Sequence, residues 1–285
     1  MRVFVFVKQT AYIYHPLAID SRGAKVDPEK IVYMLNPYDE VAVEEAVSIK
    51  DNFSGSEVIL LTAGPPRSDK ALRYAFAFGA DKMIRINLES SDPWAISLAL
   101  AQTVKGRDYD IILCGQKAID TNDNQVGSIV AEILDIAQVS AVTKLEPHPL
   151  KRMVIVERKL GRGNREVIEC RLPALFCLEA GANDPRYPNL ANRLFADKCE
   201  IELIEVDQSI FRMEGRELFG DSGVLGPPRP KPKKIFTPGT HLSALERRRL
   251  IMSQGADDKR RNVLEGSPEE VAEKIVHVLA EQAIF

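Results

Sequence analysis

The first half of the chain alternates short apolar runs with longer amphipathic stretches. The apolar runs are rich in branched side chains, and each is followed by a polar or glycine-containing turn. This pattern is typical of buried strands. The predicted strands are VFVFV at 3–7, EVILLT at 57–62, KMIRI at 82–86 and DIILCG at 110–115.

Helices are predicted between these strands, at 36–50, 68–82 and 91–106. Asn36 is a candidate N-cap before Pro37, and Gly79 and Gly106 stand where a left-handed C-cap is wanted. Strands and helices that alternate at this spacing indicate right-handed βαβ units. We therefore expect an α/β fold with a doubly wound, mostly parallel sheet over the first ~140 residues.

Beyond residue 140 the pattern changes to strands without helices between them. AVTKLEP, MVIVERKL, REVIECRL and ALFCLEAG are separated by short turns, which predicts antiparallel strands. From residue 184 a loop, a short helix and a strand predict an arm laid over another surface. Residues 220–240 are a proline-rich linker, and capped helices follow at Ser243 and Ser267. The predicted regions are 1–183 (α/β domain), 184–219 (arm) and 220–285 (linker and helices).

Composition narrows the class of protein. The 285 residues are 45% hydrophobic and 28% charged, with a net charge of −3. Neither a nucleic acid nor a membrane surface is therefore expected as a partner. No stretch reaches transmembrane length, so direct membrane insertion is not expected. The four cysteines form no CxxC pair, and buried thiols are expected rather than disulfides or a metal site. These features favour a reducing, cytoplasmic location.

Candidate binding residues follow the predicted parallel strands. In a doubly wound sheet, ligands bind outside the carboxyl ends of the strands, where the connection order reverses. The segments that reach this rim are Lys8 with Gln9, Asn36 to Asp39, Ala63 to Pro66, and Gly115 to Gln125. The last is the longest, and in AIDTNDNQVGS (118–128) small polar side chains fill the joint between a strand and a helix.

That joint favours an anion. Amides near Asn124, Gln125 and Val126 begin the next helix and present unpaired N–H groups. Asp120 and Asp123 would repel a polyphosphate but can accept hydrogen bonds from ribose or adenine. A nucleotide with few phosphates is therefore expected, and an Asx-rich turn that only caps the helix remains the alternative.

Other chemistry has little support in the sequence. No G-x-G-x-x-G follows the first strand, no P-loop motif occurs, and GRGNRE at 161–166 is predicted to be a hairpin turn. The rim segments contain no Cys/His or Ser/His pair, so no catalytic residue is expected. Glu44 and Glu45 are expected on a solvated helix face. The chain is expected to bind rather than to catalyse.

Several segments in this order and spacing resemble one family, the electron-transfer flavoprotein beta subunit. They are VKQT, LNPYDEVAVEEAV (35–47), TAGP (62–65), ALRYAFAFGADK (71–82), LCGQKAIDTNDNQVG (113–127), VERK (156–159), LPAL (172–175) and PRYPNLANR (185–193). The resemblance covers residues 1 to about 205 and the C-terminal helix. It implies an adenine-nucleotide-binding α/β domain (1–183) in a heterodimer with an alpha subunit that holds the redox FAD. It also implies that residues 184–219 are a recognition loop and a partner-embracing arm.

The resemblance also implies residue roles. Residues expected to line the nucleotide are Phe6, Asn36, Pro37, Tyr38, Asp39, Ala63, Gly115, Gln116, Lys117, Ala118, Ile119, Asp120, Thr121, Asn122, Asp123, Asn124, Gln125 and Val126. Tyr38 and Tyr12 are candidates near the alpha-subunit flavin. Leu190, flanked by Tyr187, is expected to dock an acyl-CoA dehydrogenase of fatty acid beta-oxidation, with a quinone-linked oxidoreductase as acceptor.

The identity of the nucleotide divides the family. Some members keep AMP as a structural ligand, and others bind a second FAD and bifurcate electrons from NADH. Bifurcating members read DGDTAQVGP where this chain reads DTNDNQVGS, so Asn124-Gln125 favours AMP, although Val126-Gly127 fits both. The chain departs from the family at the basic GRGNR turn and the proline-rich insert. A free-standing nucleotide sensor of universal-stress-protein type is a further alternative, but its glycine-rich phosphate loop is absent.

Overall fold

A computed structural model describes residues 1–12, 30–206, 212–213, 216–217, 243–252 and 266–281. The chain divides into two units, residues 1–224 and 225–285, and each is described by itself. The predicted linker at 220–240 lies outside the described residues, and the predicted region boundaries stay predictions.

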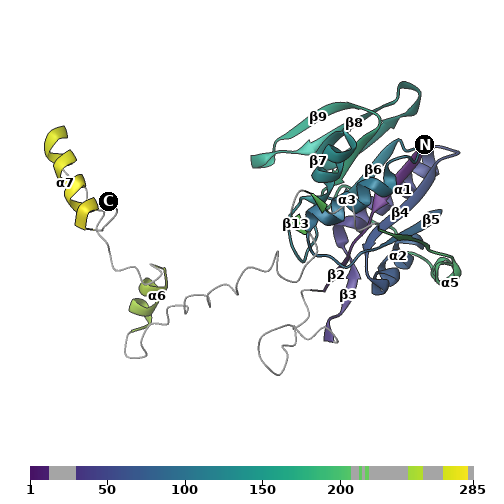
Figure 1. Cartoon of the computed structure of the whole chain (residues 1–285), viewed down its shortest axis with the longest axis horizontal. Helices are drawn as coiled ribbons and strands as arrows, with labels where there is room; N and C mark the ends of the chain where they lie inside the picture. The colour runs from purple at the N-terminus through teal and green to yellow at the C-terminus, as the bar shows by residue number, and fades with distance from the viewer. Residues whose placement is uncertain (13–29, 207–211, 214–215, 218–242, 253–265, 282–285) are drawn as a thin grey trace. The chain divides into compact units, whose positions relative to one another are not determined.

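The first unit is built on one large sheet, shown in Figure 1. In the described part of the chain its spatial order is β11 (Glu202–Glu205), β5 (Lys82–Asn87), β4 (Glu57–Gly64), β1 (Arg2–Phe6), β6 (Ile111–Gly115), β10 (Ala174–Leu178), β7 (Ala137–His148), β8 (Met153–Lys159) and β9 (Arg165–Arg171). Strands β11 to β7 are mutually parallel, and β8 and β9 continue the sheet as an antiparallel meander. The predicted α/β class is confirmed.

Helices cover both faces of the sheet. α1 (Pro37–Asn52), α2 (Asp69–Phe76) and α5 (Leu190–Lys198) share one core with the odd-numbered residues of β1, such as Val3 and Val5. α3 (Pro93–Val104) and α4 (Val126–Leu134) share the other core with Phe4 and Phe6. Successive side chains of a strand point to opposite faces, so β1 contributes to both cores. Each fully buried large apolar side chain contributes about 1.5–3 kcal/mol.

The prediction for one strand was wrong. The segment ALFCLEAG was expected among the antiparallel strands, yet β10 runs parallel to both β6 and β7 and lies between them. All five residues of β10 are buried. A strand covered on both faces needs a continuous apolar run rather than alternation. The meander of β7, β8 and β9 is confirmed, with the GRG turn (Gly161–Gly163) between the last two.

The segment after β10 is attached to its own domain. Arg186 donates to Glu44 through Nε and Nη2, both at 2.9 Å, and its backbone amide donates to the same carboxylate at 2.9 Å. The expectation that Glu44 faces solvent was therefore wrong, because this carboxylate is buried against Arg186. α5 then packs on α2, and β11 pairs with β5. Residues 186–205 of the predicted arm thus lie on their own domain, and an embrace of a partner by the rest stays a prediction.

Smaller elements complete the described chain. β2 (Gln9–Ala11) and β3 (Tyr33–Leu35) form an antiparallel pair that the apolar pattern does not reveal, and β12 (Arg212–Met213) pairs with β13 (Arg216–Glu217). The second unit contains α6 (Ala244–Met252) and α7 (Pro268–Glu281). Both predicted capping boxes are confirmed, since Ser243 and Ser267 exchange hydrogen bonds with the glutamates three residues on. Within the described residues no helix has the length and apolarity to cross a membrane.

Candidate functional site

A cavity of about 380 Å³ lies at the carboxyl ends of the central parallel strands. It begins where β1, β4 and β6 end, and the N-terminus of α4 contributes to its wall. The chain leaves β1 towards β4 and β5 on one side and returns through α3 to β6 on the other. The cavity therefore occupies the topological switch point of the sheet, the position predicted from the strand pattern.

The structure brings most of the predicted site residues to this cavity. Those that line it are Phe6, Asn36, Asp39, Ala63, Gly115, Gln116, Lys117, Ala118, Asp120, Thr121, Asp123, Asn124, Gln125 and Val126. The others, Pro37, Tyr38, Ile119 and Asn122, do not line it. Ile119 instead donates its amide to Asn36 Oδ1 at 3.3 Å, and the amide of Asn122 donates to the carbonyl of Ala118 at 2.8 Å. These two residues shape the loop from behind.

Asp39 ties three segments of the rim together. Its carboxylate accepts hydrogen bonds from the amide of Lys8 at 2.7 Å, from Asn36 Nδ2 at 2.9 Å and from the amide of Gly115 at 3.1 Å. The ends of β1 and β6 and the start of α1 therefore converge on one side chain. Burial raises the pKa of Asp39 to about 7, against the lowering effect of these three hydrogen bonds.

Asn36 extends this connection to the long loop after β6. It occupies the N-cap position of α1, as predicted, but its side chain makes no capping hydrogen bond. It donates to the carbonyl of Lys117 at 2.9 Å and accepts from Ile119, as well as donating to Asp39. A polar side chain that is almost fully buried is thus fully used within the protein. Its role is to position the loop.

Gly115 is required by close packing. A Cβ at this position would lie 2.6 Å from Tyr38 Cβ and 2.8 Å from the Tyr38 carbonyl carbon. Real side chains do not tolerate such distances, and here one of the neighbours is backbone. The first turn of α1 can therefore press against the end of β6 only where β6 carries a glycine.

The loop from Gln116 to Gln125 is shaped by local polar contacts. Asp120 accepts from Lys8 Nζ at 2.8 Å and from the amide of Thr121 at 2.8 Å. Asn122 and Asn124 adopt left-handed backbone angles, with φ of 58° and 52°, which asparagine tolerates better than most residues. Lys8 offsets the charge of Asp120, so the loop repels an anion less than its sequence suggests.

The N-terminus of α4 is open towards this cavity. Gln125 is the N-cap residue and its side chain makes no capping hydrogen bond. The first intrahelical bond in this turn is from the amide of Ile129 to the carbonyl of Gln125. The amides of the preceding residues have no acceptor within the helix and lie at the positive end of the helix dipole. This arrangement favours binding of a phosphate.

Some lining residues were not predicted. Ser90 and Ser91 lie in the loop after β5, and Ile96 and Leu100 come from α3. The rule that ligands bind at the carboxyl ends of strands would have found the two serines, because β5 ends on the same rim. Arg67 stacks over the Tyr33 ring at 5.0 Å, and both also line the cavity. No periodic pattern in the sequence indicates that contact.

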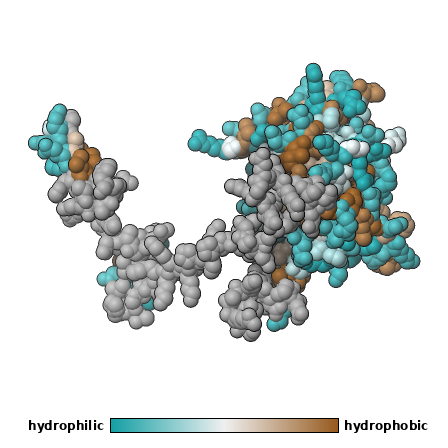
Figure 2. Space-filling view, viewed as in Figure 1, coloured by the Kyte–Doolittle hydropathy of each residue, from teal (hydrophilic) through white to brown (hydrophobic). Residues whose placement is uncertain are grey.

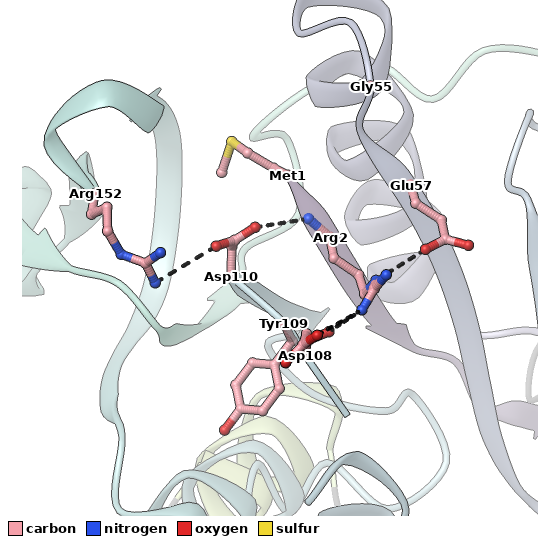
Figure 3. A pocket seen from close by; sticks show the side chains of 8 residues that line it. All are labelled: Met1, Arg2, Gly55, Glu57, Asp108, Tyr109, Asp110 and Arg152. Atoms are coloured by element: carbon pink, nitrogen blue, oxygen red, sulfur yellow. Dashed lines mark hydrogen bonds and ion pairs between the residues drawn. The ribbon is translucent and has the colours of Figure 1, made fainter. Parts of the chain in front are cut away.

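A second cavity, of about 440 Å³, lies at the amino ends of the same strands (Figure 3). Its charged side chains are paired with one another. Arg2 Nε donates to Glu57 at 3.0 Å, and the amide of Arg2 donates to Asp110 at 2.9 Å. Asp110 also faces Arg152, with a nitrogen–oxygen distance of 3.8 Å. Little charge is left here to recognise a ligand.

The predicted docking residues are exposed. The exposed fraction is 71% for Leu190 and 85% for Tyr187. Leu190 is the first residue of α5, which Asn189 caps by accepting from the amide of Asn192 at 2.8 Å. The segment is held from beneath by Arg186 and by Arg73, whose Nη1 donates to the carbonyl of Cys199 at 2.8 Å. Elsewhere hydrophobic side chains interrupt the mostly hydrophilic surface in separate patches (Figure 2).

The chain is similar in sequence to known proteins of one family. The electron transfer flavoprotein domain family matches residues 25–209. Relatives named electron transfer flavoprotein subunit beta include one from Bacillus subtilis, 35% identical over 73% of this chain and 80% of its own length, and one from Homo sapiens, 33% identical over 72% and 81%. The caffeyl-CoA reductase-Etf complex subunit CarD of Acetobacterium woodii is 36% identical over 66% of this chain and 71% of its own.

Proposed function

Because this chain belongs to the electron transfer flavoprotein beta-subunit family, we propose that it binds AMP at the carboxyl ends of its strands and supports an FAD held by an alpha subunit. In this proposal the heterodimer is a cytoplasmic electron carrier. It accepts electrons from acyl-CoA dehydrogenases of fatty acid beta-oxidation and passes them to a quinone-linked oxidoreductase. Membership of this family sets aside the free-standing nucleotide sensor.

The observation that carries the nucleotide proposal is the cavity at the switch point. It combines the open N-terminus of α4, for a phosphate, with small polar side chains such as Thr121 and Asp123, for ribose and adenine. Apolar walls from Leu61, Ile96 and Leu100 suit a base. No reacting group is needed, because the role of the ligand is structural.

The size of the cavity supports a mononucleotide. About 380 Å³ lies near the lower end of the roughly 300–1,000 Å³ range of ligand pockets. FAD consists of an AMP unit joined to a flavin mononucleotide. A second FAD would therefore have to extend beyond the described cavity. The second candidate is nevertheless the bifurcating type with NADH as donor, because Val126-Gly127 is common to both patterns.

The test is to co-purify this chain with its alpha subunit, denature the complex and identify the released nucleotides by chromatography and mass spectrometry. One FAD and one AMP per heterodimer is the expected result. Two FAD and no AMP would overturn the AMP assignment in favour of a second flavin. Loss of AMP from a variant of the cavity, such as Gly115→Ala, with FAD retained in the complex, would indicate that AMP binds to this subunit.

The docking proposal is supported by the exposure of Leu190. An aliphatic side chain on a rigid helix start can fill a small apolar pocket of a partner, and a small interface permits the quick release that electron transfer needs. Tyr187 stands beside it in the chain and is more exposed still. The anchors Glu44 and Arg73 keep this surface in place without contributing to it.

Leu190→Ala should raise the dehydrogenase concentration needed for half-maximal flavin reduction about tenfold, because burial of an exposed leucine is worth about 1.5–3 kcal/mol. Bound nucleotide should not change. Leu150→Ala is the matched control, since this leucine is fully exposed in the turn between β7 and β8. Stopped-flow flavin reduction measures both variants. An unaltered rate at limiting dehydrogenase for Leu190→Ala would rule out the docking role.

A further inference from the structure

Two cysteine sulfurs meet directly beneath the candidate nucleotide cavity. Cys114 in β6 and Cys177 in β10 are register partners on neighbouring parallel strands. Their Sγ atoms are 3.5 Å apart, with Cys114 placed to donate to Cys177. Both side chains are buried, yet Cys114 also lines the cavity. No step of the proposed function uses this dithiol.

The dithiol is in contact with the helix that closes the cavity. A Cβ on Gly127 would lie 2.7 Å from Cys177 Sγ and 2.9 Å from Cys114 Sγ. The first turn of α4 therefore rests on both sulfurs, and only glycine fits between them. The same turn presents its amides to the cavity. A change in the positions of the sulfurs is thus transmitted to the phosphate side of the site.

The surroundings of the pair distinguish its two thiols. The pKa of Cys177 is lowered by the hydrogen bond from Cys114, against the opposing effect of burial, and further by the one from Gln138 Nε2 at 3.5 Å. The pKa of Cys114 is raised well above its usual value, because its proton is held by Cys177 and its thiolate would be buried near Asp39. The pair therefore loses its first proton as a unit, with the charge placed on Cys177.

We propose that Cys114 and Cys177 are a modification site, an oxidisable dithiol that closes to a disulfide with a peroxide as oxidant. Both S–H bonds and the O–O bond of hydrogen peroxide break, one S–S bond forms, and two molecules of water are released. The two sulfurs give up two electrons, and the peroxide is reduced. In a reducing compartment such a bond is reversible by thiol exchange, as expected of a sensing rather than a structural disulfide.

The distances allow this reaction with local movement. Neighbouring strands are about 4.8 Å apart, which lies within the Cα separations of about 4.4–6.8 Å that disulfides span, and the Cβ atoms must also close to about 3.8 Å. The sulfurs must approach by about 1.5 Å to reach the bond length of about 2.05 Å. This movement shifts both sulfurs, and with them the acceptor of the Gln138 hydrogen bond and the surface on which Gly127 rests. The disulfide should therefore displace the start of α4 and weaken nucleotide binding.

The link to the nucleotide rests on the proposed function and works in both directions. Cys114 is the sulfur that faces the cavity, so bound AMP covers the route by which a peroxide reaches the pair. The disulfide should lower the affinity for AMP, and AMP should slow formation of the disulfide. We expect each effect to be about tenfold.

The test exposes the purified heterodimer, with and without AMP, to hydrogen peroxide. Free thiols are then alkylated in denaturant, and non-reduced peptides are mapped by mass spectrometry. The expected product links the peptides of Cys114 and Cys177 and disappears with dithiothreitol. Cys199→Ser, which removes a partly exposed thiol outside the pair, should form the same link, and Cys177→Ser should not. AMP affinity of the oxidised and reduced wild type is measured by calorimetry.

Each outcome decides one part of the proposal. Alkylation of both Cys114 and Cys177 under conditions that oxidise Cys199 would overturn the dithiol. A link that leaves AMP affinity unchanged would overturn its coupling to the cavity. A link in a protein that binds no AMP in either state would contradict the proposed nucleotide while leaving the dithiol in place.

Discussion

The two cavities of the first unit lie at opposite ends of the same parallel strands and differ in how they use polar groups. At the amino ends, carboxylates and guanidinium groups neutralise one another, as in the contacts of Arg2 and Asp110. At the carboxyl ends, buried polar side chains such as Asn36 and Asp39 are consumed in positioning loops, and helix amides remain open. Volume alone does not distinguish them, because the two cavities are of similar size, about 440 and about 380 Å³. The carboxyl-end cavity is the better candidate for a binding site, because the first amides of α4 have no acceptor within the helix while hydrogen-bonded side chains hold the surrounding loops in place.

The largest expected effect concerns Asp39 and stability. Its pKa rises from 3.8 to about 7 on folding, because burial disfavours the carboxylate. The folded state therefore binds more protons than the unfolded state between these values, and stability from this group is fully present below pH ~4 and lost as pH rises to about 7. We expect the unfolding free energy of wild type relative to Asp39→Asn to fall by on the order of 4 kcal/mol over this range. Guanidinium unfolding of both proteins from pH 4 to 8 measures it, and a difference that is constant or rises with pH would contradict the assignment.

Gly115→Ala should have the next largest effect, on ligand binding. The added methyl group cannot fit against the Tyr38 backbone, so the end of β6 and the loop that follows must move. We expect AMP affinity to fall about 100-fold, equivalent to about 2.7 kcal/mol. Calorimetry on nucleotide-depleted heterodimer is the measurement. Gly161→Ala, at an exposed turn where a Cβ meets nothing within 4 Å, should bind as wild type does. Equal affinity of the two variants would show that the close packing of Gly115 on Tyr38 does not maintain the site.

Arg152→Gln should have the smallest effect, because it changes the amino-end cavity. This side chain is mostly exposed and faces Asp110 at 3.8 Å in the amino-end cavity. Exposed ion pairs contribute about 0–1 kcal/mol. AMP affinity should stay within about twofold, and stability within that range. Loss of nucleotide from this variant, seen in the denatured complex by chromatography, would show that the amino-end cavity contributes to nucleotide binding.

The sequence predicts those parts of this molecule that depend on neighbours along the chain. The parallel strands, the helix caps at Ser243 and Ser267 and the polar loop after β6 follow from local periodicity and turn chemistry. The cavity follows from one topological rule applied to those strands. Fourteen of the predicted lining residues accordingly meet there.

The features that could not be predicted depend on partners distant in the chain. By its local sequence Glu44 is a solvent-exposed acid, but in the structure it pairs with Arg186, which lies 142 residues further along the chain. Asn36 is a local N-cap by pattern, yet its hydrogen bonds go to the loop at Lys117 and Ile119. The orientation of β10 depends on which strands accept it as a neighbour. Its unbroken apolar run was the available signal, and it favours a strand buried on both faces.

The most direct test of the central claim is photolabelling of the nucleotide-depleted heterodimer with 8-azido-AMP, followed by peptide mapping. We expect the label on peptides of this chain that line the carboxyl-end cavity, above all residues 115–126, and we expect excess AMP to prevent the labelling. Label on peptides that contain Arg2 or Arg152, or only on the alpha subunit, would show that the nucleotide binds elsewhere.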